Sequence, residues 1–189
     1  KEIIEILNKH QIFYDDYAFK YGSIIAYIDD EKIQITSLRE DINQVGRHTN
    51  IIYTNDWKKD AMRRDFTMNS IYLSRNGDLD DYFDGCKDIK LKAIRFVGDP
   101  EERVQEDYLR IYRYYRFLGL FDVPIDNNDY EFILNNYIKQ TFNYLSNDII
   151  RKEILKMFNT PYSLNCFYNI STFNKKRTWI EVVKNHFIN

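Results

Sequence analysis

Two short stretches of the sequence hold residue types that could bind a nucleotide. The first is RRDFTMNS, residues 63–70, where Arg63 and Arg64 carry planar, permanently charged groups suited to phosphate oxygens. Asp65 can hold one of these guanidinium groups in place, and Asn69 can both donate and accept a hydrogen bond at a sugar or a phosphate. The alternative is an exposed charged turn that binds nothing, and spacing alone does not exclude it.

The second stretch is EDYLRIYRYYRF, residues 106–117, in which Asp107 precedes Arg110 by one helical turn. On a helix, this spacing places a hydrogen-bond acceptor beside a donor. Cytosine and adenine present an amine beside a ring-nitrogen acceptor, whereas uracil and guanine present an oxygen where that amine would be. An unpaired buried group costs about 1–3 kcal/mol, so the pair can select C and A over U and G. The alternative is an ordinary ion pair between neighbouring turns, worth about 0.2–0.5 kcal/mol.

Further basic residues follow on the same predicted helix. Arg113 and Arg116 alternate with aromatic residues, a mixture that suits phosphate contacts and base stacking. The aromatic residues can equally form a core with the arginines at its edge, and we favour that interpretation for them. They are Tyr112, Tyr114, Tyr115 and Phe117.

The first half of the chain contains RRDFTMNS, so the elements predicted there must position it. Helices and strands alternate in this half. Apolar spacing predicts a helix over residues 2–9, and turn residues predict a hairpin with its turn at Asp29-Asp30. Asp56 is a candidate N-cap for the helix that leads into RRDFTMNS, and Asn76-Gly77 is a strong turn signal. The predicted strands are 23–28, 32–38, 50–54 and 70–74, and the polar segment 39–50 is predicted to be a mobile loop.

The chain becomes helical near residue 98. Asp99 as N-cap and Pro100 in the first turn predict the start of the helix that carries the second stretch. A further helix is predicted to begin near Ser146. We therefore predict an α+β fold, with a domain of mixed or antiparallel sheet and helices at residues 1–97 and an all-α domain at 98–189.

Composition excludes several classes of protein. The net charge of the 189 residues is −2, so contacts with nucleic acid would have to come from a local patch. Cys86 and Cys166 are far apart and the three histidines are scattered, so we expect a reducing cytoplasm and no zinc site. No apolar run approaches the ~18 residues of a membrane span, so we expect no membrane partner.

Four segments, taken together and in order, resemble the class II, bacterial-type family of tRNA CCA-adding nucleotidyltransferases and poly(A) polymerases. The resemblance is close over about residues 1–120 and looser over LSNDIIRKEILKMF. No one segment would carry it alone. The four are YGSIIAYIDDEKIQITSLRED, GRHTNIIYTNDWKKDAMRRDFTMNSIYL, GDLDDYFDGCKDIK and IRFVGDPEERVQEDYLRIYRYYRF.

The resemblance implies a nucleotidyltransferase head and a helical neck, with ATP and CTP as substrates and tRNA as the acceptor. It implies base reading by Asp107 and Arg110, and a flexible loop at residues 37–48. Contacts with the ribose and the triphosphate are implied for Arg63, Arg64, Asp65, Asn69, Arg113 and Arg116, and a turn motif for Asp81, Phe83, Gly85 and Asp88.

The sequence departs from the family in its catalytic carboxylates. The family's catalytic element, a Gly-Gly strand followed by an Asp-x-Asp pair that binds Mg²⁺, is expected just before residue 1, and that combination does not occur in these 189 residues. Gln34 stands where the family usually has a glutamate. We therefore assign no catalytic or metal-binding residue in this chain, expect Mg²⁺ only with the missing segment, and expect the chain alone to be inactive.

Three interpretations remain open at this stage. The chain is one part of a divided enzyme completed by a second polypeptide, or a non-catalytic nucleotide- or RNA-binding module, or a remnant without function of its own. The sequence does not distinguish CCA addition from addition of A alone or CC alone, nor from poly(A) synthesis.

Overall fold

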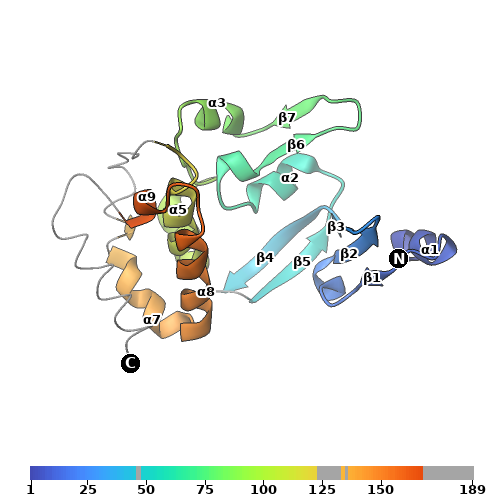
Figure 1. Cartoon of the computed structure of the whole chain (residues 1–189), viewed down its shortest axis with the longest axis horizontal. Coiled ribbons are helices and arrows are strands. Elements are labelled where there is room, and N and C mark those ends of the chain that lie inside the picture. The colour runs from blue at the N-terminus through green and yellow to red at the C-terminus, as the bar shows by residue number, and fades with distance from the viewer. Residues whose placement is uncertain (46–47, 123–132, 135, 168–189) are drawn as a thin grey trace. The chain divides into compact units, whose positions relative to one another are not determined.

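The computed structural model describes residues 1–45, 48–122, 133–134 and 136–167 (Figure 1). These residues form two compact units, which we treat separately. Unit 1 comprises Lys1–Asn43 and Thr49–Arg63, and unit 2 comprises Gln44–His48 and Arg64–Asn189. The domain boundary predicted at residues 97/98 remains a prediction.

Unit 1 is built on a three-stranded antiparallel sheet of order β1-β2-β3. Its strands are β1 (Tyr14–Asp15), β2 (Ser23–Ile28) and β3 (Glu31–Thr36). Asp29 and Asp30 have φ of 49° and 66°, which is the left-handed conformation that a tight hairpin turn requires. The predicted hairpin is therefore confirmed, with its second strand ending at Thr36.

Helix α1 (Glu2–Lys9) covers the apolar face of this sheet (Figure 1). Leu7 of the helix packs with Ile24 and Ala26 of β2, and all three side chains are buried. Because alternate residues of a strand point to opposite faces, the register fixes which half of β2 joins this small core. The predicted helix over residues 2–9 is confirmed.

The segment predicted as a loop at residues 39–50 is mostly strand, so that prediction was wrong. A two-stranded sheet contains β4 (Arg39–Val45) and β5 (His48–Tyr53), while residues 46–47 of the expected loop lie outside the described residues. Its polar composition misled because β4 is held by pairing with β5, and backbone pairing does not require apolar side chains. The short helices η1 (Phe19–Tyr21) and α2 (Trp57–Met62) complete unit 1.

Unit 2 begins with a short hairpin. The one-turn helix η2 (Thr67–Asn69) precedes strands β6 (Ile71–Leu73) and β7 (Leu79–Asp81), which pair antiparallel. Gly77 lies in the turn with φ of 91°, which confirms the turn predicted at this position. Helix α3 (Gly85–Lys90) follows.

The rest of unit 2 is helical in the described residues. Asp99 caps α4 (Pro100–Glu106), as predicted, by accepting hydrogen bonds from the amides of Glu101 and Glu102 at 3.0 Å each. The predicted helix near Ser146 is α8 (Asn147–Phe158). The remaining helices are α5 (Leu109–Leu118), η3 (Ile138–Gln140), α7 (Thr141–Tyr144) and α9 (Ser163–Phe167).

The core of unit 2 gathers around α5, against which α8 and α9 pack (Figure 1). Tyr112, Tyr114 and Tyr115 of α5 are buried, which confirms the core interpretation of these aromatic residues. Phe66 is fully buried against Phe96, with ring centroids 4.8 Å apart. Antiparallel strands and helices together confirm the predicted α+β fold.

Candidate functional site

Asp65 joins the two stretches singled out in the sequence. Its Oδ2 lies 2.8 Å from Nη2 of Arg113 on α5, and its Oδ1 accepts hydrogen bonds from Nδ2 of Asn69 at 3.0 Å and from the amide of Phe66 at 2.9 Å. The residue is only 6% exposed, so the alternative of an exposed charged turn is wrong for Asp65. Three of the predicted binding residues therefore form one polar cluster.

The backbone around Asp65 is fixed by pairing with a distant segment. The Asp65 carbonyl accepts from the amide of Val97 at 3.1 Å, and the Thr67 amide donates to the carbonyl of Arg95 at 2.9 Å. Between these two bonds, the side chain of Phe66 fills the core. A carboxylate anchored on both sides in this way presents its oxygens in one fixed direction, which suits the orientation of a guanidinium.

The prediction that Asp107 and Arg110 lie on one continuous helix was wrong. Helix α4 ends at Glu106, Asp107 is extended with φ of −151°, and α5 begins at Leu109. The Oδ1 of Asp107 accepts from the Leu109 amide at 3.0 Å, and the Asp107 carbonyl accepts from the Arg110 amide at 3.0 Å. The carboxylate thus bonds an amide in the first turn of α5. Aspartate forms such bonds readily, which is why it is more favourable at the start of a helix than in its interior.

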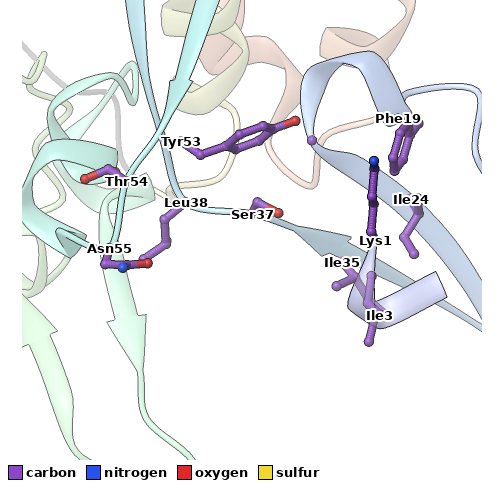
Figure 2. A pocket seen from close by; sticks show the side chains of 11 residues that line it. Lys1, Ile3, Phe19, Ile24, Ile35, Ser37, Leu38, Tyr53, Thr54 and Asn55 are labelled. Atoms are coloured by element: carbon purple, nitrogen blue, oxygen red, sulfur yellow. The ribbon is translucent and has the colours of Figure 1, made fainter. Parts of the chain in front are cut away.

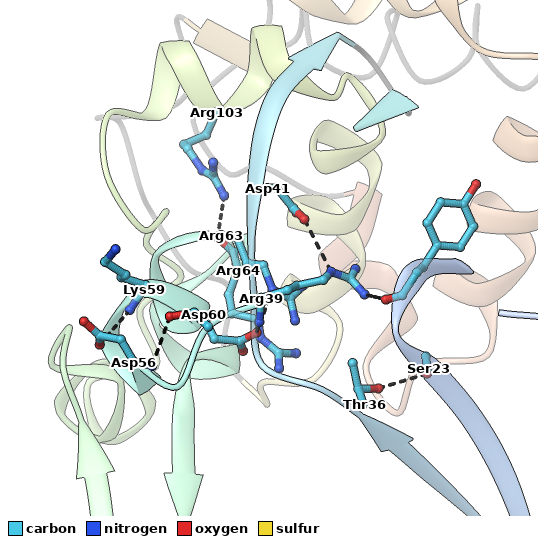
Figure 3. Close-up of polar contacts among 12 residues, drawn as sticks. Ser23, Thr36, Arg39, Asp41, Asp56, Lys59, Asp60, Arg63, Arg64 and Arg103 are labelled. Carbon is cyan, nitrogen blue, oxygen red and sulfur yellow. Dashed lines mark hydrogen bonds and ion pairs between the residues drawn. The ribbon is translucent and has the colours of Figure 1, made fainter. Parts of the chain in front are cut away.

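Two residues that sequence reasoning missed hold Arg110 in place. Arg110 is 5% exposed, and its Nη1 donates to Oε2 of Glu106 at 2.5 Å and to the carbonyl of Arg103 at 2.7 Å. The same oxygen of Glu106 also accepts from Nη1 of Arg103. Nη2 of Arg103 donates to the carbonyl of Arg64 at 2.7 Å (Figure 3). The spacing of Glu106 and Arg110, four apart on a helical pattern, was the available signal.

The remaining arginines of α5 and RRDFTMNS differ in their surroundings. Arg116 faces α8, where its Nε lies 3.2 Å from Oε2 of the buried Glu153. Arg64 is half-buried, with its guanidinium carbon 6.0 Å from the centre of the Tyr72 ring. Arg113 is the more accessible partner of Asp65, since 38% of its side chain is exposed.

Arg63 belongs to unit 1, where it contacts Asp60. Its Nε donates to Oδ1 of Asp60 at 2.8 Å, and the same carboxylate accepts from the backbone amide of Arg39 at 3.0 Å (Figure 3). Asp60 is fully buried, so this ion pair is the anchor of the last turn of α2. Arg63 thus has a structural role in unit 1, whatever it contributes to binding.

Gln34 lies on β3 within a neutral hydrogen-bond network. Its Nε2 donates to Oγ of Ser23 at 2.9 Å, and that hydroxyl lies 2.9 Å from Oγ1 of Thr36 (Figure 3). Over the described ranges of the chain, no cluster of three or more histidine, cysteine, aspartate or glutamate side chains is arranged to hold a metal ion.

The turn motif around α3 is structural in character. The carboxylate of Asp81 accepts from the amides of Gly85 and Cys86 at 2.8 Å each, and Asp88 is buried and accepts from the Thr67 hydroxyl at 2.6 Å. Although partial burial of the carboxyl acts to raise it, the pKa of Asp81 is lowered overall by these two amide bonds. The motif ties α3 to the segment that follows Asp65.

A cavity of about 630 Å³ lies within unit 1 (Figure 2). None of the residues that the sequence predicts to bind a nucleotide lines it, so we do not assign it to that role. Its lining consists of Lys1, Ile3, Phe19, Gly22, Ile24, Ile35, Ser37, Leu38, Tyr53, Thr54 and Asn55. Among the helices that the structure describes, none has the length and apolar character of a membrane span.

Residues 1–95 match the sequence family described as the poly A polymerase head domain. The chain is 50% identical over 110 residues to the human protein named CCA tRNA nucleotidyltransferase 1, mitochondrial, which covers 58% of this chain and 25% of that protein. It is 33% identical over 156 residues to a CCA-adding enzyme of Staphylococcus saprophyticus, covering 82% of this chain and 39% of that enzyme. The chain thus spans a quarter to two fifths of the length of these relatives.

Solved structures show the same fold. A Bacillus stearothermophilus CCA-adding enzyme in complex with CTP superimposes with a TM-score of 0.70 at 24% identity, over 82% of this chain and 37% of that one. A tRNA nucleotidyltransferase complexed with a primer tRNA and an incoming ATP analog gives 0.73 at 24% identity, over 96% and 50%. Because the family match covers half of the chain, the protein belongs to the class II family of CCA-adding tRNA nucleotidyltransferases and poly A polymerases.

Proposed function

We propose that this chain is the nucleotide-selecting part of a tRNA nucleotidyltransferase that adds CCA, or A alone, to the 3′ end of tRNA from CTP and ATP. The ion pair between Asp65 and Arg113 carries this proposal. It holds the RRDFTMNS segment, through Asp65, against the helix that carries Arg110. A structural brace would need only this pair, whereas a triphosphate site also needs accessible cations beside it, such as the half-buried Arg64 and Arg113.

We assign roles by chemistry and accessibility. Arg64 and Arg113 are the strongest candidates for the triphosphate, since both are partly accessible in unit 2. Asn69 serves the ribose, oriented by its bond to Asp65. Arg63 and Arg116 belong to the wider set of proposed phosphate contacts, in which each must share its guanidinium with a carboxylate.

Base selection is assigned to Asp107 and Arg110. Asp107 has an extended backbone, and its Oδ1 accepts from the Leu109 amide at the start of α5. In the described part of the chain, the hydrogen bonds of the Arg110 guanidinium are made by Nη1, which leaves the Nη2 edge for the base. An acceptor and a donor held in this way can complement the edge shared by cytosine and adenine.

We propose that the metal-binding carboxylates lie outside these residues. On this proposal, an Asp-x-Asp strand outside these residues, carried by the same polypeptide or by a separate one, joins the sheet of unit 1, in which β3 is the last strand of the described order. With Mg²⁺ bound there, the tRNA 3′-hydroxyl would be activated and the pyrophosphate leaving group shielded. The residues of this chain would bind and orient the nucleotide.

A non-catalytic nucleotide- or RNA-binding module is the second candidate. Gln34 favours it, because an amide that donates to Ser23 cannot replace the negative charge of a metal-binding carboxylate. Such a module would retain base selection without any need for a completing segment.

Incorporation of labelled CTP and ATP into tRNA lacking its CCA end separates the two candidates. We expect no incorporation by the chain alone, and incorporation with Mg²⁺ after an Asp-x-Asp segment is supplied from upstream sequence or a separate chain. If a well-folded complex of the two stayed inactive while the chain still bound CTP, the binding module would be the correct interpretation. The identity of the added nucleotides would also show whether the product is CCA, CC or A.

Arg110→Ala tests the assignment of base reading. We expect the variant to lose much of its preference for CTP over UTP while its affinity for triphosphate changes less. An equal loss for all four nucleotides would show that Arg110 does not read the base.

Localisation in a reducing cytoplasm remains a prediction, and the human relative is named as mitochondrial.

A further inference from the structure

The contacts around Arg110 close into a ring that links two segments of unit 2. Starting from the Arg64–Asp65 backbone, Arg103 donates to the Arg64 carbonyl at 2.7 Å and also contacts Glu106. Glu106 in turn binds Arg110 at 2.5 Å. One turn further along α5, Arg113 returns to Asp65 at 2.8 Å. The ring therefore joins the segment proposed to bind phosphate to the residue proposed to read the base.

The ring depends on the single negative charge of Glu106, because two arginines share it. One of its carboxylate oxygens serves both Arg103 and Arg110, whose side chains are only 11% and 7% exposed. Two guanidinium groups that share one carboxylate oxygen repel each other, and the single negative charge between them offsets that repulsion. Arg103 also donates from Nη2 to the Arg64 carbonyl, 39 residues away in sequence, so that its guanidinium is held at two points.

We propose that Arg103 is a positioning residue for base selection, which acts on Arg110 through Glu106. The inference rests on the proposed function. In this arrangement, Arg103 fixes where the Glu106 oxygen lies, and that oxygen fixes the rotation of the Arg110 guanidinium. Because the same Arg103 side chain is bound to the Arg64 carbonyl, the base-reading edge is set at a constant position relative to the segment that binds the triphosphate.

A simple structural brace would behave differently. If Arg103 only held α4 against the Arg64–Asp65 segment, its loss would lower the stability of unit 2. It would also lower the affinity for every nucleotide by the same factor. A positioning residue changes the ratio of affinities between CTP and UTP, because only the orientation of the base-reading edge distinguishes these two ligands. The ratio of affinities stays the same when some of the molecules lose the ability to bind either nucleotide.

The test is isothermal titration of the 189-residue chain with CTP and with UTP, using Arg103→Gln and the matched control Lys92→Gln. Both variants remove one positive charge, but Lys92 contacts the exposed Asp122 and lies outside the ring. We expect Arg103→Gln to lower the ratio of CTP to UTP affinity about tenfold, or about 1.4 kcal/mol. We expect Lys92→Gln to leave the ratio unchanged. Glu106→Gln should act in the same direction as Arg103→Gln.

A double variant shows whether the effect passes through Arg110. Once Arg110→Ala has removed the base reader, Arg103→Gln should cause no further loss of selectivity, whereas independent roles would make the two losses multiply. Arg103→Lys, which keeps the charge but cannot bridge Glu106 and the Arg64 carbonyl as a fork, should retain part of the ratio. It replaces Arg103→Gln in the cycle if the latter does not fold.

The outcomes separate this inference from the proposed function. If the unaltered chain prefers CTP and Arg103→Gln keeps that preference, the positioning role is wrong and the proposed function stands. Equal weakening of both nucleotides, together with a lower melting temperature, would identify Arg103 as a brace and overturn the inference. If the unaltered chain itself binds CTP and UTP equally, the proposed base selection fails, and the role of Arg103 fails with it.

Discussion

Replacement of Asp65 by asparagine should destabilise unit 2 measurably, because Asp65 is the buried member of the ion pair with Arg113. Asparagine keeps the shape, and its amide oxygen can still accept from Phe66 and Asn69, which bond Oδ1 at 2.9 and 3.0 Å. The contact that is lost is the one between Oδ2 and Arg113, 2.8 Å apart, where asparagine would place its amide NH₂ group, a donor, against the donors of the guanidinium. The perturbation therefore isolates one charge.

The magnitude follows from the exposure of the two partners. Asp65 is 6% exposed and the Arg113 side chain 38%, so the pair lies between two limits: exposed pairs contribute about 0.2–1 kcal/mol, and removing one partner of a buried pair costs about 3–5 kcal/mol. Its contact is that of an ion pair, not of an aligned hydrogen bond. We therefore expect Asp65→Asn to lower the free energy of unfolding by about 2 kcal/mol, or the melting temperature by about 4–8 °C.

Near-ultraviolet circular dichroism during heating is a suitable assay, because buried tyrosines of α5 report on unit 2. Asp122→Asn is the matched control, since it removes an equal charge from an exposed pair with Lys92 and should leave the melting temperature unchanged. The cycle with Arg113→Gln should show coupling of about 1 kcal/mol or more. Losses that add within about 0.5 kcal/mol would refute the assigned ion pair, as would an unchanged melting temperature for Asp65→Asn.

Three further substitutions test the structure. Gly85→Ala should lower the melting temperature by several degrees, since a Cβ there would lie 2.3 Å from the carbonyl oxygen of Thr67; an unchanged value would contradict this packing. Tyr112→Phe should cost about 1 kcal/mol in urea unfolding, because the buried hydroxyl lies 2.8 Å from that of Thr141, and a neutral result would mean that this bond contributes nothing. Asp81 has a pKa below its ordinary 3.8 in the folded protein, so it stabilises the fold above that pH and ceases to do so as the pH falls through the folded-state value. The stability gap between the unaltered chain and Asp81→Asn should therefore narrow below about pH 4 in acid titrations of the melting temperature.

Local signals in the sequence predicted the elements whose ends are set by neighbouring residues. Asp99 and Pro100 predicted the start of α4 because a cap bonds amides two and three residues away. The hairpin turn at Asp29 and Asp30 was predictable for the same reason, since left-handed backbone is a property of the turn itself. The family resemblance was likewise readable in the order and spacing of four motifs, and the match over residues 1–95 confirms it.

Two predictions were wrong where local preference met a competing partner. The polar segment beginning at Arg39 reads as a loop, yet it forms β4 because another strand pairs with it. The helix through Asp107 reads as continuous, yet the carboxylate bonds the Leu109 amide and the helix restarts. The strand β4 depends on its pairing with β5, whereas the bond between Asp107 and the Leu109 amide is local, so the restart of the helix had a signal in the sequence.

The sequence by itself determined the family, the α+β class, the positions of most helices and strands, and the residue types that can bind a nucleotide. Only the tertiary structure decided how those residues are held: Asp65 against Arg113, and Arg110 against Glu106 and Arg103. The physical reason is range. Caps and turns act between residues a few positions apart, whereas an ion pair that anchors a binding residue joins segments that meet only after the core around Phe66 and α5 has packed.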